Sequence, residues 1–215
     1  MLSAVAVTDP LVLHRFTVRP GHLDAWLDSW PELVAARRRA GFTWHRAFVE
    51  TDAEPKVTWL YSHPDPSAGA AALASDALAS GLDASLARHV FRNDLIRPVR
   101  PELVTHATPG SVDGRIAIMR RYSIVNGWPA FLDIWRRIVP VREKYGFTCL
   151  FAVSDEPADM FTWAFDHAGD WAGFPAAQRD YYRDPARVEL RGVFDHMADY
   201  SIHPATQLLL PGDAG

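Results

Sequence analysis

Cysteine and lysine are scarce in this chain of 215 residues. The single cysteine, Cys149, excludes an intrachain disulfide framework and a cysteine-based zinc cluster, and it fits a reducing cytosol. Lysine occurs only at Lys56 and Lys144, so arginine supplies nearly all of the 22 basic side chains. These are outnumbered by 26 acidic side chains, which gives a formal net charge of −4. Because the chain has no basic excess, we do not expect it to bind nucleic acid.

Long apolar runs and the common catalytic motifs are also missing. No apolar stretch reaches the roughly 18 residues of a membrane-spanning helix, and the N-terminus lacks the basic and apolar regions of a signal peptide. We therefore expect a cytoplasmic protein without a membrane partner. The chain has no GxGxxG motif after a strand, no P-loop, no HExxH and no GxSxG. Functions based on dinucleotides, nucleoside triphosphates, zincin chemistry or a serine nucleophile therefore lack support, and we expect no metal site.

An internal repeat organises the chain. Residues 15–30, RFTVRPGHLDAWLDSW, match residues 121–135, RYSIVNGWPAFLDIW, with one deletion in the second copy. The match continues through the GFT segments at 41–43 and 146–148, the Thr-Trp pairs at 58–59 and 162–163, and His63 with His167. A segment rich in helix and strand breakers, residues 102–114, separates the copies. We therefore infer two homologous units, residues 1–107 and 108–215.

Each copy predicts the order strand, helix, strand, strand, helix, strand. The first strands cover residues 11–18 and 115–124, and one long helix follows each, with apolar residues at helical spacing through 23–37 and 128–142. Hairpin strands follow at 42–50 with 57–63, and at 147–154 with 160–167. The second helices are expected at 68–78 and 170–182, and the last strands at 92–100 and 195–203. This order indicates an α+β fold of two tandem ferredoxin-like β-α-β-β-α-β units.

The first strand carries apolar residues on both of its faces. Val12 and Phe16 point to one side, whereas Leu11 and Leu13 point to the other. The helices of a ferredoxin-like unit cover only one face of its sheet, so the other face also needs a partner. The simplest solution is that the two copies pack sheet to sheet as an intramolecular dimeric α/β barrel.

The motifs of both copies resemble the NIPSNAP family of the dimeric α/β-barrel superfamily. In the first copy they are residues 15–21, 41–42, 57–61 and 96–98, and in the second copy residues 121–124, 127, 161–165 and 202–204. The second copy departs from the pattern because it lacks a proline before Gly127, and the first copy carries an alanine-rich stretch. The resemblance implies cofactor-free monooxygenases, cyclases, isomerases or decarboxylases of secondary metabolism, haem-degrading enzymes, or ligand binders.

Three arginines are candidates for a site because they lie within first strands. Arg15 and Arg121 are equivalent, and a sheet covered on both faces leaves such a side chain in need of a carboxylate partner or an anionic ligand. A structural ion pair that locks the copies together and an anion-binding role both remain open. Arg120 points to the opposite face from Arg121 and is in register with His14, so the two copies differ at this position.

Histidines supply the candidate acid–base groups. His63 and His167 end the third strands, where an imidazole could move protons near neutral pH, bind haem iron or simply cap the strand. His45 lies in the middle of a strand of the first copy only. On the expected last strand, His196 and Tyr200 share a face and could form a proton relay with Tyr122, unless these are satisfied polar groups at a barrel seam.

We therefore predict an enzyme of biosynthetic, secondary metabolism that uses cofactor-independent acid–base chemistry of the monooxygenase, cyclase or isomerase type. Its substrate would be an aromatic or polyketide-like molecule bound between sheet and helices, with the second copy as the preferred active half. The predicted catalytic residues are His167, His196, Tyr122 and Arg121. The predicted substrate-binding residues are Arg120, Tyr200, Trp163, Phe165, His63, Arg15 and His45. The alternatives are a haem protein that binds iron through His63, His167 or His196, and a non-enzymatic binder or scaffold. Association of the pseudo-dimer into a homodimer stays open.

Overall fold

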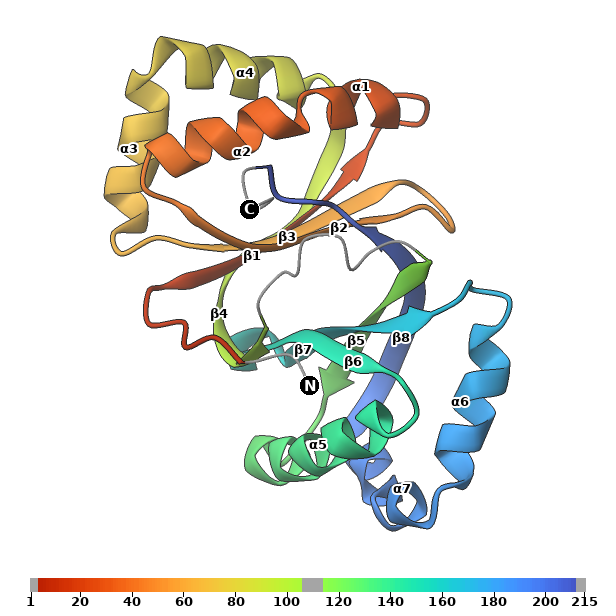
Figure 1. The fold of residues 1–215 in the computed structure, drawn as a ribbon. Coiled ribbons are helices and arrows are strands. Elements are labelled where there is room, and N and C mark those ends of the chain that lie inside the picture. The colour runs from red at the N-terminus through yellow and green to blue at the C-terminus, as the bar shows by residue number, and fades with distance from the viewer. Residues whose placement is uncertain (1–3, 106–113, 212–215) are drawn as a thin grey trace. The chain divides into compact units, whose positions relative to one another are not determined.

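The computed structural model describes residues 4–105 and 114–211 and divides into two compact units (Figure 1). The N-terminal unit comprises residues 6–99 and 206–211, and the C-terminal unit comprises residues 4–5, 100–105 and 114–205. The chain thus passes from one unit to the other within strand β4 (Val90–Val104) and again within strand β8 (Met197–Gln207). The boundary predicted near residue 108 lies outside the described residues, and the start of the predicted linker, residues 102–104, belongs to β4.

The N-terminal unit is an antiparallel sheet with helices on one face. Its elements are β1 (Leu11–Val18), α1 (Leu23–Asp28), α2 (Trp30–Arg39), β2 (Thr43–Glu50), β3 (Lys56–Ser62), α3 (Pro66–Ser75), α4 (Ala77–Ala87) and the first part of β4. The hydrogen-bonded order of the strands is β4-β1-β3-β2. Figure 1 shows α1 to α4 together on the same side of this sheet.

The C-terminal unit repeats this topology. Its elements are β5 (Arg115–Ile124), α5 (Trp128–Glu143), β6 (Thr148–Asp155), the 3₁₀ turn η1 (Glu156–Ala158), β7 (Met160–Ala168), α6 (Phe174–Arg183), α7 (Pro185–Glu189), the 3₁₀ turn η2 (Arg191–His196) and β8. The strand order is β8-β5-β7-β6, which matches that of the N-terminal unit. The predicted α+β fold of two tandem ferredoxin-like units is therefore confirmed.

The helices of the N-terminal unit are more broken than the sequence predicts. The single helix expected after β1 is divided at Ser29 into α1 and α2. Pro31 explains the division, because it has no N–H to continue the ladder of α1 but fits the first turn of a new helix. The helix expected at 68–78 is likewise two helices, because the side chain of Asp76 accepts hydrogen bonds from the amides of Leu78 and Ala79 and begins α4 there.

Each unit has its own aromatic core between sheet and helices. The N-terminal core contains Trp26, Trp30 and Trp59, and the C-terminal core contains Trp135 and Trp163, as their helical and strand spacing predicts. The end of the chain also packs on the N-terminal core. Trp30 Nε1 donates to the carbonyl of Leu209 at 2.8 Å, and the side chain of Leu210 is buried. Residues far apart in the sequence therefore stabilise the same unit.

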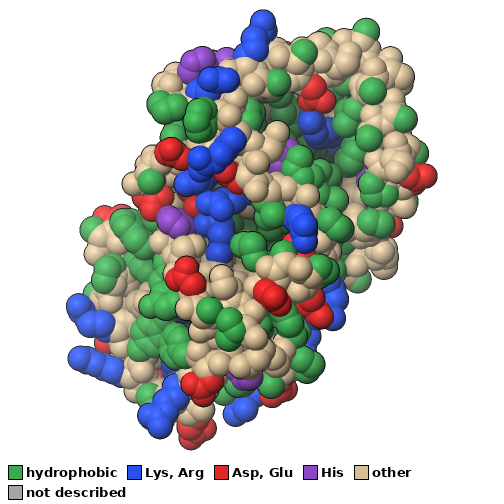
Figure 2. Space-filling view, turned by 180° about the vertical axis from the view of Figure 1, so that it is seen from behind, with side chains coloured by type: hydrophobic (Ala, Val, Ile, Leu, Met, Phe, Trp, Pro, Cys, Tyr) green, Lys and Arg blue, Asp and Glu red, His purple; other side chains and the backbone are tan. Residues whose placement is uncertain are grey.

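Charged side chains of both signs share the face of the molecule drawn in Figure 2. Figure 2 shows basic and acidic side chains close together on the face that it draws, with apolar side chains between them. None of the helices in residues 4–105 and 114–211 combines the length and the apolar character needed to span a membrane.

Candidate functional site

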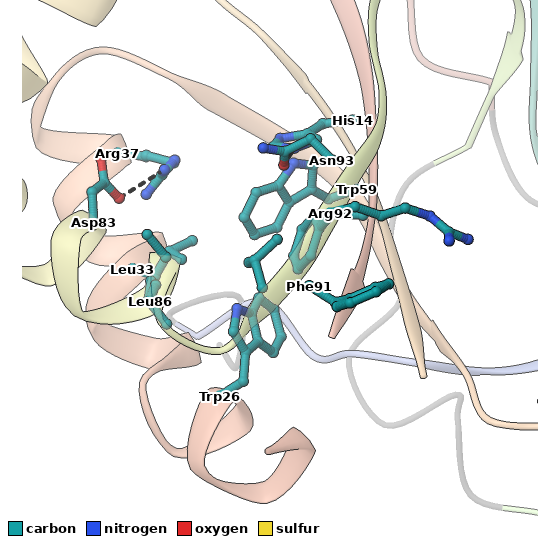
Figure 3. Close-up of a pocket in the computed structure, with 13 residues that line it drawn as sticks. His14, Trp26, Leu33, Arg37, Trp59, Asp83, Leu86, Phe91, Arg92 and Asn93 are labelled. Atoms are coloured by element: carbon teal, nitrogen blue, oxygen red, sulfur yellow. Dashed lines mark hydrogen bonds and ion pairs between the residues drawn. The ribbon is translucent and has the colours of Figure 1, made fainter. Parts of the chain in front are cut away.

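A pocket of about 330 Å³ opens between the helices and the sheet of the N-terminal unit. Strands β1, β3 and β4 form one wall, and α2 and α4 form the other (Figure 3). The volume is at the small end of the range for small-molecule sites. The lining residues are His14, Phe16, Trp26, Leu33, Arg37, Trp59, Asp83, Leu86, Ala87, Val90, Phe91, Arg92 and Asn93.

Aromatic rings form the apolar part of this pocket. The ring of Trp59 lies 5.0 Å from that of Phe16 and 5.9 Å from that of Trp26, measured between centroids. All three side chains are almost fully buried, so packing fixes their orientation. A flat aromatic ligand would find preformed ring faces and edges here, which favour stacked or edge-to-face contacts.

His14 and Asn93 place a neutral imidazole on the strand wall. Nε2 of His14 lies 3.2 Å from Oδ1 of Asn93, and Figure 3 shows the two side chains together at the edge of the pocket. Since an amide oxygen can only accept, Nε2 carries the proton and the lone pair is on Nδ1. The pKa of His14 is lowered from 6.5 to about 4, mainly by burial and to a smaller extent by the positive charge of Arg37, while the hydrogen bond to Asn93 raises it. At neutral pH, His14 is therefore an uncharged proton acceptor.

Arg37 and Asp83 face this imidazole from the helix wall. Nη2 of Arg37 donates to Oδ1 of Asp83 at 3.0 Å, and the guanidinium carbon lies 5.5 Å from the centroid of the Trp59 ring. In Figure 3 this pair lies on the helix side of the pocket and the pair of His14 and Asn93 lies on its strand side. The pocket thus joins a neutral base and a fixed cation in an apolar setting, where charges act more strongly than in water.

The equivalent region of the C-terminal unit is filled. By the sequence repeat, Arg120 corresponds to His14, Arg142 to Arg37, and Tyr122 to Phe16. These residues line a cavity of only about 10 Å³, roughly the space of one water molecule. Helices α6 and α7 occupy the rest of the space with tyrosine and arginine side chains. The two copies therefore differ in whether this region has room for an organic ligand. The C-terminal unit has a separate pocket of about 350 Å³, which is lined mainly by α6 and contains none of the predicted site residues.

Two of the predicted catalytic residues, His167 and His196, lie outside both of these pockets. His167 is the last residue but one of β7, and its ring lies 5.1 Å from that of Phe147. Burial together with the nearby charge of Arg115 lowers its pKa. His196 was expected on the last strand, but it ends the turn η2, one residue before β8 begins. The preceding 3₁₀ turn directs its ring to Asn126, whose Oδ1 lies 3.0 Å from Nδ1.

The expected relay of His196, Tyr122 and Tyr200 is only partly assembled. The rings of Tyr122 and Tyr200 are 6.5 Å apart and perpendicular. Tyr122 is buried in the C-terminal core, whereas Tyr200 is 51% exposed. Because His196 hydrogen-bonds to Asn126 instead, the structure brings the two phenols together without the imidazole.

The remaining C-terminal candidates are buried. Arg120 and Arg121 follow each other in β5, so their side chains leave opposite faces of the strand, and only Arg120 lines the small cavity. Trp163 and Phe165 belong to the hydrophobic core of the C-terminal unit. These positions place Arg120 and Trp163 beside a cavity too small for the predicted substrate.

The candidates in the N-terminal unit have protein partners. Nε of Arg15 lies 3.9 Å from Oε1 of Glu50, so a carboxylate accompanies this strand arginine. His45 shares a 3.0 Å hydrogen bond with Oγ of Ser62, and burial lowers its pKa to about 4, with Arg46 adding to the effect. Neither Arg15 nor His45 lines the pocket of the N-terminal unit.

His63 has the geometry of a cap at the end of a strand. Its Nε2 donates to the carbonyl of Ala40 at 3.0 Å, and its Nδ1 accepts from the amide of Asp65 at 2.9 Å. Both ring nitrogens are therefore engaged, and no lone pair is left for haem iron. None of His63, His167 and His196 lines the 330 Å³ pocket, so these residues do not fit haem there.

Sequence reasoning missed the pair Arg37 and Asp83. Arg37 was recognised only as the end of the apolar stripe on the first helix, and Asp83 lay beyond the predicted second helix. The available signal was the charge of Arg37 itself, because the other positions of that stripe are apolar and face the core. His14 enters the sequence analysis only as the counterpart of Arg120, and Asn93 does not enter it at all, although both line the open pocket.

No family model and no curated protein sequence matches this chain. Solved structures do match, and they show that the chain shares their fold, that of tandem ferredoxin-like units of the dimeric α/β-barrel type. A candidate monooxygenase from Fusobacterium nucleatum superposes with a TM-score of 0.70 at 10% identity, over 94% of each chain. A candidate monooxygenase from Lactobacillus acidophilus gives a TM-score of 0.65 at 8% identity, also over 94% of each chain. An anthrone oxidase-like protein gives 0.62 at 10% identity, over 100% of this chain and 99% of its own. At these identities the likeness shows the fold alone.

Proposed function

We propose that this protein is a cofactor-independent enzyme of the monooxygenase type, acting on a planar aromatic or polyketide-like molecule of secondary metabolism. The observation that carries the proposal is the pocket of the N-terminal unit, whose lining contains the neutral base His14 and the cation Arg37, both against the ring of Trp59. The active half is therefore proposed to be the first copy. The sequence had favoured the second copy, in which the equivalent space is about 10 Å³.

The chemistry begins with the removal of a proton. The substrate rings lie against Trp59, and Nδ1 of His14 accepts a proton from an acidic C–H or O–H group of the substrate. The anion so formed is stabilised by Arg37 and in turn favours the protonated imidazole, since an opposite charge nearby raises a histidine pKa. Asn93 accepts the hydrogen bond from Nε2–H, which also favours the charged ring.

Dioxygen is the oxidant in this proposal. The substrate anion reacts with O₂ at the deprotonated carbon, and a methylene group becomes a carbonyl group with release of one water molecule. One oxygen atom enters the product and the other leaves as water, so the substrate supplies both electron pairs and no further reductant is needed. The proton held by His14 leaves with that water. Oxidation of an anthrone-type methylene fits this balance, and one structural neighbour is described as anthrone oxidase-like.

The test is oxygen consumption by the purified protein with a panel of anthrone-type and phenolic substrates. His14→Asn removes the base, and Arg37→Met removes the cation while keeping much of the side-chain volume. We expect kcat to fall about 100-fold or more for His14→Asn, within the usual range for loss of a general base. His22→Asn is the matched control, because His22 is exposed and lies outside the pocket lining. Unchanged turnover in both pocket variants contradicts the proposal.

Two other outcomes would identify a different function. Saturable binding of an anthrone without turnover would indicate a binder, and the same pocket variants would then weaken binding. A Soret band in the purified protein would indicate haem. His63 would then be an unexpected ligand, because both of its ring nitrogens are hydrogen-bonded. The narrower NIPSNAP assignment stays part of this proposal and rests on the motifs of the two copies.

A further inference from the structure

Three arginines are buried together in the C-terminal unit. Arg120 on β5, Arg142 on α5 and Arg187 on α7 are 2%, 3% and 4% exposed, respectively. All three line the same cavity of about 10 Å³. We refer to these residues as the arginine cluster.

Neutral aromatic rings surround the arginine cluster. The guanidinium carbon of Arg142 lies 4.2 Å from the ring centroid of Phe165 and 4.3 Å from that of Tyr181. Arg187 lies 5.2 Å from the ring of Tyr182. Such cation–π contacts attract each guanidinium group, but they bring no negative charge to offset the repulsion between cations.

Several polar atoms of the arginine cluster lack a hydrogen-bond partner within the described part of the chain. They are Nε and Nη1 of Arg120, Nε and Nη1 of Arg142, and Nε of Arg187, and Oη of Tyr181 joins them at the same cavity. No aspartate or glutamate is among the described residues that line this cavity. A buried donor without an acceptor is costly, and a buried cation without a counter-charge more so. The described lining of the cavity thus presents positive charge and unpartnered donors, with tyrosine hydroxyls, one of them hydrogen-bonded to Arg120, but no carboxylate.

In the N-terminal unit, the arginine equivalent to Arg142 has a carboxylate partner. Arg37, the counterpart of Arg142 in the repeat, pairs with Asp83 at 3.0 Å. In the C-terminal unit, burial and the nearby charge of Arg120 instead lower the pKa of Arg142 to about 10. The duplication therefore supplies an internal comparison: one copy of this arginine has an acidic partner, and the other faces a small cavity.

We propose that the arginine cluster binds one small monovalent anion of the halide class, with chloride as the physiological occupant. A cavity of about 10 Å³ holds a body the size of one water molecule, so a small shift of the side chains admits a single-atom anion. The N–H groups of Arg120 and Arg142 and the hydroxyl of Tyr181 supply the donors. The anion neutralises part of the buried charge and stabilises the C-terminal unit.

The first test is thermal unfolding in chloride at constant ionic strength, with gluconate as the replacement anion. Because an anion that binds only the folded chain stabilises it by mass action, Tm is expected to rise by about 3–5 °C for each tenfold increase in chloride above the Kd. Arg142→Met is expected to abolish this rise. Arg37→Met, the equivalent change in the N-terminal unit, is the matched control and is expected to keep it. A Tm that does not depend on chloride in the wild-type protein overturns the proposal.

The second test needs no variant and remains decisive if Arg142→Met fails to fold. Bromide replaces chloride in a crystal, and its anomalous scattering is expected to give one peak between Arg120 and Arg142. Absence of that peak at saturating bromide contradicts the assignment.

Two other results would identify a different counter-charge for the arginine cluster. Stabilisation by acetate without stabilisation by chloride contradicts the proposal, because it would indicate a carboxylate site. A phenolate absorption at neutral pH that disappears in Tyr182→Phe overturns it as well, since Tyr182 would then be the counter-charge.

Discussion

Protonation of His14 is expected to destabilise the protein. The pKa of this side chain is lowered from 6.5 to about 4 in the folded chain, mainly by burial. Between these two values the unfolded chain binds more protons than the folded one, so stability is complete above pH 6.5 and falls as the pH drops towards 4. A shift of about 2.5 units corresponds to at most about 3 kcal/mol of unfolding free energy.

The assay is urea unfolding at a series of pH values between 4 and 7.5, for the wild-type protein and for His14→Asn. Carboxylates and the other histidines, including His45 with its own pKa of about 4, contribute to both proteins. The difference between the two curves therefore isolates His14. We expect the wild-type protein to lose more stability than the variant on acidification, and the excess to develop between pH 6.5 and pH 4.

Parallel curves would refute this reasoning, and so would a direct titration of the His14 ring by NMR with a pKa near 6.5. A second variant tests the cause. The charge of Arg37 contributes to the low pKa, so Arg37→Met is expected to raise the pKa of His14 without restoring it fully, since burial is the larger cause. If the pKa were unchanged in Arg37→Met, the two groups would not face each other across the pocket.

Three further predictions concern stability, each measured by urea unfolding. Glu50→Gln is expected to lower stability by about 3 kcal/mol, because it removes the carboxylate that lies 3.9 Å from Arg15. A smaller loss when Glu50→Gln is made in the Arg15→Met variant would show that the two side chains are coupled. Equal losses in the two backgrounds would contradict the coupling. Gly69→Ala is expected to cost about 1–3 kcal/mol, because its Cβ would lie 2.8 Å from atoms of His63 and Phe42. Gly81 lies on the next helix, and its new Cβ would have nothing within 4 Å, so Gly81→Ala is expected to stabilise the protein by about 0.5–1 kcal/mol. A Gly69→Ala variant more stable than Gly81→Ala would be inconsistent with this packing. Leu210→Ala is expected to cost about 2–4 kcal/mol, because this side chain is buried against the N-terminal core; an unchanged midpoint would show that the chain end does not pack there.

The fold could be predicted because its signals are local and repeated. The apolar spacing that begins at Leu23 and at Trp128, the GFT segments and the strand patterns recur in both copies, so each copy supports the interpretation of the other. The division between α1 and α2 was missed because the periodicity of apolar residues continues across it. The effect of Pro31 on the backbone outweighs that periodicity.

The candidate site was harder to predict because it depends on residues from separate elements and on what fills the space between them. The sequence marks Arg120 and His14 as a difference between the copies, and this difference does lie at the cavities. It does not show that Tyr181 and Arg187 close one cavity, because the second helices of the two copies share no motif. Whether a pocket is open depends on those side chains, and only the folded structure shows them.

The central claim is that the N-terminal unit holds the pocket for the organic ligand. The most direct measurement is NMR of the tryptophan indole N–H groups during titration with a non-reacting anthrone analogue, with each signal assigned by a single Trp→Phe substitution. We expect the signals of Trp26 and Trp59 to shift, because both rings line the 330 Å³ pocket, and those of Trp135 and Trp163 to stay in place. Shifts confined to Trp135 and Trp163 would contradict it and return the active site to the second copy.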